Sequence, residues 1–163
     1  CLLSRGLGDV YKRQTPYRVI LDYAHAPDAL SNILRTCRTF TKRRLIALFG
    51  CGGDRDKGKR PIMGRIGGEL ADLCILTSDN PRTEDPMEIL REIEEGIKET
   101  TGEYVVIENR RDAIRHALEI GREGDIIVLC GKGHETYQET MGVKRPFDEK
   151  VVVQELLTEL RGE

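Results

Sequence analysis

The sequence has no tryptophan, and aromatic residues make up only 5% of its 163 residues. A surface on which nucleic-acid bases stack is therefore not expected, and the formal net charge of −2 argues against general binding to nucleic acids. No apolar run approaches the roughly 18–20 residues that a membrane-spanning helix requires. The composition therefore predicts a protein that binds neither nucleic acid nor a membrane.

The sequence also has no pair of cysteines in a C-x-x-C spacing. Its five cysteines are odd in number and scattered, so neither a zinc site nor a disulfide framework is indicated. Catalytic signatures are missing as well, because the chain contains no G-x-S-x-G, no G-x-G-x-x-G and no H-E-x-x-H. We therefore expect a cytoplasmic protein that binds ligands, with no metal site and no catalytic residues of its own.

The segment of residues 1–14 has no initiating methionine and lacks the charge distribution of a signal peptide. Its pattern does not continue into the sequence that follows. We therefore expect a non-native leader carried over from cloning or sequencing, and a single domain over residues 15–163.

Short apolar runs alternate with helical patterns along that domain. The runs predicted to form strands are residues 17–21, 45–49, 73–77, 104–107 and 125–130. The segments predicted to form helices are residues 27–37, 61–71, 86–100, 111–122 and 148–161. Strands buried on both faces and separated by helices predict a doubly wound, mostly parallel Rossmann-like α/β sheet with helices on both faces. Residues 136–147 predict an antiparallel hairpin that turns at Met141 and Gly142.

Polar motifs follow the predicted strands, at the edge where such a sheet binds its ligands. In the loop of residues 50–61, GCGGDRDKGKRP, four basic residues against two acidic ones leave a net charge of +2. This charge favours an anionic ligand, and a solvated surface turn is the alternative. The loop is similar to the phosphate-binding pattern G-x-x-x-x-G-K-[ST], but Arg60 stands where a hydroxyl would bind magnesium. We therefore do not assign it as a phosphate loop.

The motif SDNPR, after the third strand, places an anion, an amide and a guanidinium within four residues, at Asp79, Asn80 and Arg82. Pro81 stiffens this group, which suits recognition of a zwitterion. Asp79 would bind an ammonium and Arg82 a carboxylate. The alternative is an ion pair between these two side chains.

The motif GKGHE, residues 131–135, follows the fifth strand, and its glycines allow the backbone to approach a ligand. Glu135 is a candidate for binding a second ammonium, and Lys132 or His134 for binding an anion. His25, in the turn after the first strand, is a candidate ligand contact, with a structural histidine as the alternative.

Five motifs in this order identify a resemblance that covers nearly all of the chain after its leader. They are DYAHAPDAL, FGCGGDRDKGKRPIMG, SDNPRTEDP, GKGHETYQ and RPFD. Together they resemble the C-terminal domain of the Mur ligases, and within that family the members that add meso-diaminopimelate. The resemblance implies a domain of an ATP-dependent amide ligase of peptidoglycan synthesis, used in cell-wall biogenesis.

In that family ATP and Mg²⁺ activate the D-glutamyl carboxylate of UDP-MurNAc-L-Ala-D-Glu as an acyl phosphate, which the amine of the incoming amino acid attacks. The family holds the phosphates and the magnesium mainly in a central domain, which we expect to be absent from this chain. We therefore expect a monomeric fragment that folds but does not catalyse ligation alone.

The resemblance also assigns roles to individual residues. Arg55 matches a residue that contacts a carboxylate of the amino acid, and Arg82 matches the contact to its distal carboxylate. The substrate-binding residues implied are Arg55, Asp79, Asn80, Arg82, Gly131 and Glu135, and the nucleotide-binding residues are Asp22, for the ribose, and His25.

Three alternatives remain open at this stage. The chain could be a stand-alone domain that binds an amino acid or a nucleotide without ligase activity, or part of a lysine-adding ligase. A folylpolyglutamate or cyanophycin synthetase is disfavoured, because the substrates of those enzymes lack the second zwitterionic end that SDNPR and GKGHE would bind.

Overall fold

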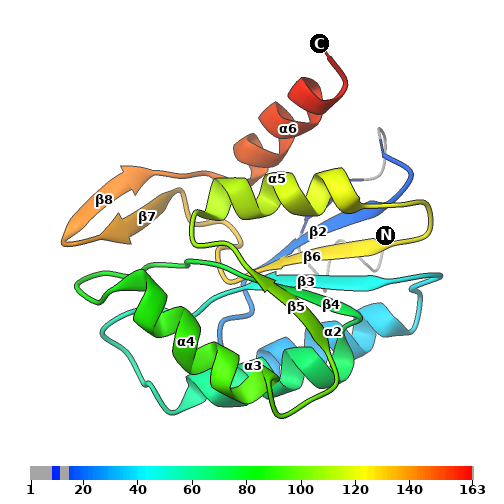
Figure 1. Cartoon of the computed structure of the whole chain (residues 1–163). Helices are drawn as coiled ribbons and strands as arrows, with labels where there is room; N and C mark the ends of the chain where they lie inside the picture. The colour runs from blue at the N-terminus through cyan, green and yellow to red at the C-terminus, as the bar shows by residue number, and fades with distance from the viewer. Residues whose placement is uncertain (1–8, 12–14, 163) are drawn as a thin grey trace.

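The computed structural model describes residues 9–11 and 15–162, which form a six-stranded sheet, a separate two-stranded sheet and covering helices (Figure 1). The strands are β1 (Asp9–Tyr11), β2 (Arg18–Asp22), β3 (Leu45–Phe49), β4 (Leu73–Leu76), β5 (Glu103–Val106), β6 (Ile126–Cys130), β7 (Tyr137–Thr140) and β8 (Val143–Pro146). The helices are α2 (Pro27–Arg38), α3 (Lys59–Leu70), α4 (Pro86–Ile97), α5 (Arg110–Ile120) and α6 (Glu149–Leu160).

The strand order in the large sheet is β1-β2-β6-β3-β4-β5, so the last strand of this sheet along the chain lies between β2 and β3. The pairs β2–β6, β6–β3, β3–β4 and β4–β5 are all parallel. Strands β7 and β8 form the antiparallel hairpin near the C-terminus. The predicted doubly wound, mostly parallel sheet with an added hairpin is therefore confirmed.

Strand β1 was not expected, because residues 1–14 were assigned to a non-native leader. Its backbone pairs antiparallel with β2, with Val10 opposite Ile20. The rest of that segment, residues 1–8 and 12–14, lies outside the described residues. Whether residues 1–14 are native stays a prediction, but three of them add a strand to the edge of the sheet.

Most helices begin at residues that satisfy their free N–H groups. The side chains of Asp85, Asn109 and Asp148 accept main-chain hydrogen bonds at the starts of α4, α5 and α6. Pro27 is the first residue of α2, where its missing N–H removes no helical hydrogen bond. These signals explain why the predicted starts of those helices lie within one residue of the observed ones.

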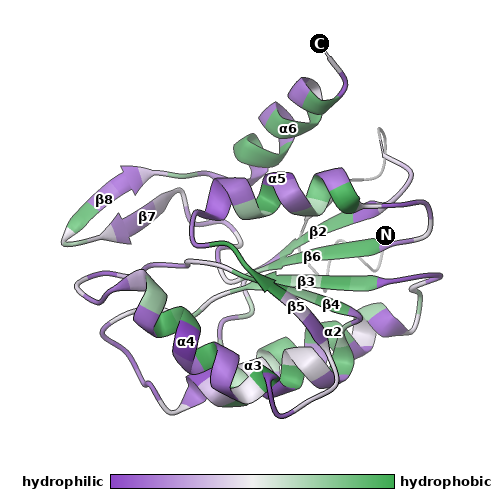
Figure 2. Cartoon of the chain, viewed as in Figure 1, coloured by the Kyte–Doolittle hydropathy of each residue, from purple (hydrophilic) through white to green (hydrophobic). Residues whose placement is uncertain are grey.

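Two apolar clusters sandwich the sheet, one on each face. Helices α2, α3 and α4 cover one face, and α5 and α6 cover the other. Strands β3 and β6 are buried at every residue, and their side chains alternate between the two clusters. Figure 2, which colours residues by hydropathy, shows a hydrophobic (green) centre of the sheet, whereas the hairpin is mainly hydrophilic (purple).

Helices α3 and α4 pack closely because glycines replace side chains at their contact. A Cβ atom on Gly64 would lie 2.0 Å from the main-chain oxygen of Ile93. A Cβ atom on Gly96 would lie 1.8 Å from the main-chain oxygen of Pro61. This close contact fixes the start of α3, and with it the loop that follows β3.

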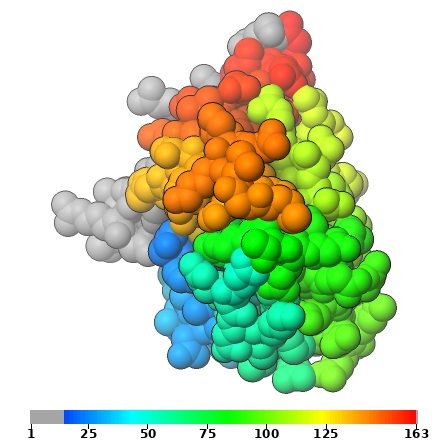
Figure 3. Space-filling model, turned by 90° about the vertical axis from the view of Figure 1, so that its left-hand side faces the viewer, coloured from blue at the N-terminus to red at the C-terminus, as the bar shows by residue number. Residues whose placement is uncertain are grey.

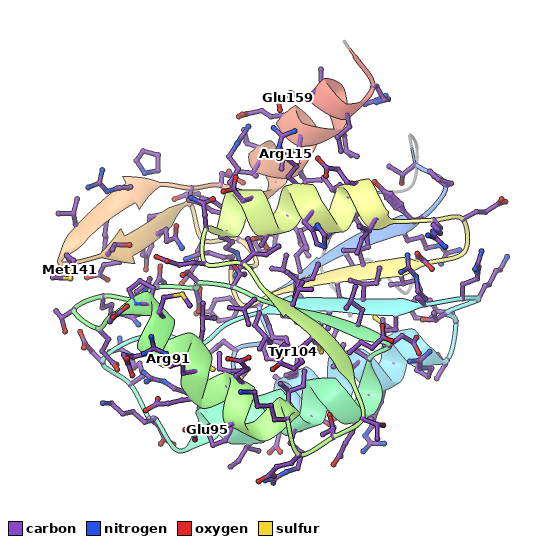
Figure 4. All side chains as sticks on the ribbon, in the orientation of Figure 1. Arg91, Glu95, Tyr104, Arg115, Met141 and Glu159 are labelled. Carbon is purple, nitrogen blue, oxygen red and sulfur yellow. The ribbon has the colours of Figure 1, made fainter. Side chains whose placement is uncertain are left out.

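On the other face, ion pairs join α5 to α6. Arg115 and Glu159 approach each other between the two helices (Figure 4), and Arg111 lies 3.1 Å from Glu155. Among the described residues, no helix combines the length and apolar character needed to cross a membrane.

Candidate functional site

The loops after β3, β4 and β6 meet at the carboxyl edge of the sheet. The first two touch through their backbones, because the N–H of Gly53 donates to the main-chain oxygen of Asn80 at 2.8 Å. A Cβ atom on Gly53 would lie 1.8 Å from the oxygen of Pro81, so this contact requires glycine. The third loop begins at Gly131, whose N–H donates to the oxygen of Asp22 at 3.0 Å.

These loops, together with the turn after β2, line a cavity of about 280 Å³. The residues that line it are Tyr23, His25, Gly52, Arg55, Lys59, Asp79, Asn80, Arg82, Gly131 and Glu135. All six residues predicted to bind the amino acid are among them, together with His25. Cationic and anionic side chains therefore share one cavity, although they come from three different loops.

Asp22 does not line this cavity. Its carboxylate Oδ1 accepts a hydrogen bond from the N–H of Ala24 at 2.9 Å, which shapes the turn after β2. Burial raises the pKa of Asp22, and the hydrogen bond from Ala24 opposes that rise. The structure thus shows a role for Asp22 in the turn, and its contact to a ribose stays a prediction.

His25 is exposed at the rim of the cavity and is held by local contacts. Its Nδ1 lies 2.9 Å from the main-chain oxygen of Tyr23, and the two rings meet edge to face at 4.6 Å. Lys59 Nζ donates to the main-chain oxygen of His25 at 3.0 Å. Tyr23 and Lys59 were not predicted as site residues, although both belong to the quoted motifs DYAHAPDAL and FGCGGDRDKGKRPIMG.

The side chains of Asp79 and Arg82 do not pair with each other, so the alternative of a mutual ion pair is wrong. Arg82 Nη1 donates to the oxygen of Gly53 at 2.9 Å, and Arg82 Nε lies 3.6 Å from Glu139 Oε1. Asp79 Oδ1 instead lies 3.2 Å from Lys132 Nζ. Asp79 and Arg82 therefore have separate partners, and both side chains also line the cavity.

Lys132 occupies a different place from the one predicted. Its side chain is fully buried, and its Nζ donates to Asn80 Oδ1 at 2.6 Å and to the oxygen of Tyr137 at 3.1 Å. The same ammonium lies 3.7 Å from Glu135 Oε1. Neither Lys132 nor His134 lines the cavity, so the expectation that one of them binds an anion there is not supported.

Because the Lys132 ammonium contacts both carboxylates of the cavity, it leaves them with one net negative charge. Burial lowers the pKa of Lys132, and the attraction of Asp79 opposes that effect. Asn80 Oδ1 accepts from both Lys132 and the N–H of Glu139, so its amide nitrogen is directed toward Glu135, 3.5 Å away. This end of the cavity can bind one ammonium group.

Arg60 also differs from the sequence-based interpretation, which counted it in a positively charged loop. Its side chain is fully buried and donates to Glu84 at 2.7 Å and to Glu92 at 2.6 Å. The hydrogen bonds from Arg60 lower the pKa of Glu84 to about 2, helped by the N–H of Asp54. Of the four basic residues in the loop, Arg55 and Lys59 line the cavity.

A second buried ion pair stabilises the carboxyl edge of the sheet. Arg110 Nε donates to Glu149 Oε2 at 2.7 Å, and both side chains are fully buried. The same guanidinium donates to the main-chain oxygens of Ser78 at 3.0 Å and Cys130 at 2.9 Å. It therefore ties together the ends of β4 and β6, from which two of the three loops start.

Comparison with known proteins agrees with the family that the five sequence motifs indicate. Residues 9–133 match the family described as Mur ligase, glutamate ligase domain. The UDP-N-acetylmuramoyl-L-alanyl-D-glutamate–2,6-diaminopimelate ligase of Clostridium botulinum is 57% identical over 144 residues, which are 88% of this chain and 29% of that protein. The ligase of the same name from Clostridium perfringens is 54% identical over 166 residues, 95% of this chain and 34% of that protein.

A solved structure of a 2,6-diaminopimelate ligase of this kind superposes with a TM-score of 0.89 at 43% identity, covering 94% of this chain and 31% of that one. The murein peptide ligase of Psychrobacter arcticus, at 20% identity and a TM-score of 0.64, shares the fold. The chain spans about a third of the length of these relatives. From the family match and these relatives, the chain belongs to the Mur ligase family, of which it represents the glutamate ligase domain.

Proposed function

We propose that this chain is the amino-acid-binding domain of an ATP-dependent amide ligase of peptidoglycan synthesis, which joins meso-diaminopimelate to UDP-MurNAc-L-Ala-D-Glu. The observation that carries the proposal is the cavity, in which Arg55 and Arg82 face Asp79 and Glu135. Diaminopimelate has an ammonium and a carboxylate at each end, so its two carboxylates complement Arg55 and Arg82, and one ammonium complements the net negative charge left at Asp79 and Glu135. The names of the relatives with more than 50% identity support the same substrate.

Within the cavity, the proposed roles divide by charge. Arg55 binds one carboxylate of the amino acid, and Arg82 binds the carboxylate at the distal end. Asp79 and Glu135 bind the distal ammonium, and Asn80 orients Glu135 by donating to it from its amide nitrogen. Gly131 has a φ of 112°, which allows the backbone to approach the ligand without a side chain in the way.

We propose that ATP and Mg²⁺ are held mainly by parts of the enzyme beyond this chain, with Asp22 and His25 beside the nucleotide. Among the described residues, no group of three or more His, Cys, Asp or Glu side chains is arranged to hold a metal ion. When bound, ATP supplies the phosphoryl group that activates the D-glutamyl carboxylate. The contribution of this chain is to orient the attacking amine.

Calorimetric titration of this chain with meso-diaminopimelate, and with L-lysine as the matched ligand, tests the proposal. L-lysine has the distal ammonium but no distal carboxylate, so it would leave Arg82 without a partner in the cavity. We expect diaminopimelate to bind more tightly than lysine. A preference for lysine would indicate a lysine-adding ligase, and the absence of heat with both ligands would contradict an amino-acid site in this chain.

A further inference from the structure

The hairpin formed by β7 and β8 contributes little to the core of the domain. Strand β8 is exposed along its whole length, and both strands are mainly hydrophilic (Figure 2). At its tip, Met141 is 68% exposed and points away from the rest of the molecule (Figure 4). The burial of apolar surface therefore does not explain why the hairpin is ordered against the domain.

What holds the hairpin is the loop after β4, which carries the ligand-binding side chains. The N–H of Arg82 donates to the oxygen of Glu139 at 3.0 Å, and the N–H of Met141 donates to the oxygen of Arg82 at 2.5 Å. Arg82 and Thr140 form a parallel bridge. Figure 3 shows the hairpin, in orange, seated on the green segment that contains this loop. The loop is thus paired with β7 as a short additional strand would be.

Side chains extend this pairing to the other residues of the motif. Gln138 Nε2 donates to the main-chain oxygen of Asp79 at 2.7 Å, and the N–H of Glu139 donates to Asn80 Oδ1 at 2.9 Å. The carboxylate of Glu139 lies 3.6 Å from Arg82 Nε. Gln138 contacts Asp79, and Glu139 contacts both Asn80 and Arg82.

The backbone conformation of Arg82 requires stabilising contacts of the kind that the hairpin provides. Its φ is 52°, in the left-handed region that residues with a side chain seldom adopt. Such a conformation persists where surrounding contacts determine it. For Arg82 those contacts include the two main-chain hydrogen bonds to the hairpin, which fix the backbone from which the guanidinium reaches Gly53 and the cavity.

We propose that the hairpin of residues 137–146 is the specificity element of this site, because it fixes Arg82 in the position that binds the second carboxylate of the amino acid. The inference rests on the proposed function of the cavity. It assigns selectivity for that carboxylate to residues that do not line the cavity, which act through the loop they hold.

The substitution Met141→Pro tests this inference. Proline cannot adopt the φ of 51° found at Met141, and it removes the N–H that donates to Arg82. Met141→Gly is the matched control, because glycine keeps the N–H and adopts positive φ freely. Gln138→Leu is a second variant that leaves the turn intact and removes one bond to the loop.

The measurement is the ratio of the Kd for L-lysine to the Kd for meso-diaminopimelate, by calorimetry on the whole chain. We expect M141P to lower this ratio roughly tenfold, which is less than the effect of losing the Arg82 contact outright, through weaker binding of diaminopimelate with lysine unchanged. Q138L should lower it less, and M141G should leave it as in the unmodified chain. The thermal midpoint of M141P should stay near that of M141G.

The outcomes separate this inference from the proposed function. An unmodified chain that does not prefer diaminopimelate would overturn the proposed function and, with it, the inference. An unmodified chain that does prefer it, with M141P showing the same ratio, would overturn the inference alone. Unfolding of M141P would also overturn it, because the hairpin would then be part of what keeps the domain folded.

Discussion

Arg82 Nη1 lies 2.9 Å from the main-chain oxygen of Gly53, a residue in the loop after a different strand. This hydrogen bond fixes the guanidinium at Nη1, and the contact with Glu139 fixes it at Nε. Among the described residues, no hydrogen bond to Arg82 Nη2 would compete with a ligand carboxylate at the cavity. The guanidinium is therefore oriented before the ligand arrives, which lowers the cost of binding.

The substitution Arg82→Ala should weaken binding of meso-diaminopimelate by about 2–4 kcal/mol, as expected when one partner of a buried charge pair is lost. Binding of L-lysine should change little, because lysine has no distal carboxylate. Calorimetry with both ligands measures the two effects. Arg91→Ala is the control, since Arg91 is an exposed arginine on α4 (Figure 4). If R82A keeps the same ratio of the Kd for L-lysine to the Kd for meso-diaminopimelate as the unmodified chain, the role of Arg82 is wrong.

The chain alone should not catalyse ligation. We expect no release of phosphate when the chain is incubated with ATP, Mg²⁺, UDP-MurNAc-L-Ala-D-Glu and meso-diaminopimelate. The reason is that the chain spans only about a third of the length of its relatives. A phosphate-release assay checks this, with a full-length relative as the positive control. Turnover by the chain would show that residues within it bind and activate the phosphates.

The ion pair of Glu84 and Arg60 should make stability fall in acid. The pKa of Glu84 is lowered from an ordinary 4.5 to about 2, so its ionised form stabilises the folded state. That contribution is complete above about pH 4.5 and is lost as the pH falls toward 2. The free energy of unfolding in urea, measured at pH 6 and at pH 3, should therefore decrease between them.

Glu84→Gln should be less stable than the unmodified chain at pH 6 and should lose less stability between pH 6 and pH 3. Glu95→Gln, on the exposed side of α4 (Figure 4), is the matched control and should keep the original dependence. An equal loss of stability in E84Q and E95Q would show that Glu84 does not contribute to the acid dependence.

The contact between α3 and α4 should not tolerate a side chain at Gly96. Alanine there would place its Cβ 1.8 Å from the oxygen of Pro61, so the helices would have to separate. We expect a loss of about 1–3 kcal/mol in the free energy of unfolding, as for other overpacked cores. At Gly58, where the nearest atom is the flexible Asp56 carboxylate at 3.2 Å, alanine should cost less. Equal losses for G96A and G58A would contradict this account.

The strands could be predicted because their apolar runs are buried on both faces. The run of residues 45–49 coincides with β3, and that of residues 125–130 contains β6. The turn at Met141 and Gly142 was also predicted, and both residues have positive φ as that turn requires. The cavity residues followed from motifs at strand ends, because the carboxyl ends of parallel strands meet at one edge.

The partners of the buried charges could not be predicted. Arg60 and Lys132 appear as solvated side chains in a charged sequence, since charged residues are rarely buried without a partner. Their partners are distant along the chain: Glu84 lies 24 residues from Arg60, and Asn80 lies 52 residues from Lys132. The sequence shows no periodicity that would join such positions. The pairing of β7 with the loop of residues 79–82 was missed for the same reason.

The place of β6 between β2 and β3 has a consequence for synthesis of the protein on the ribosome. Until residue 130 has left the exit tunnel, the edges of β2 and β3 that pair with β6 in the folded protein have no partner strand. Unpaired edges of apolar strands are where nascent chains aggregate. The six-stranded sheet can therefore be completed only after β6 has emerged from the ribosome.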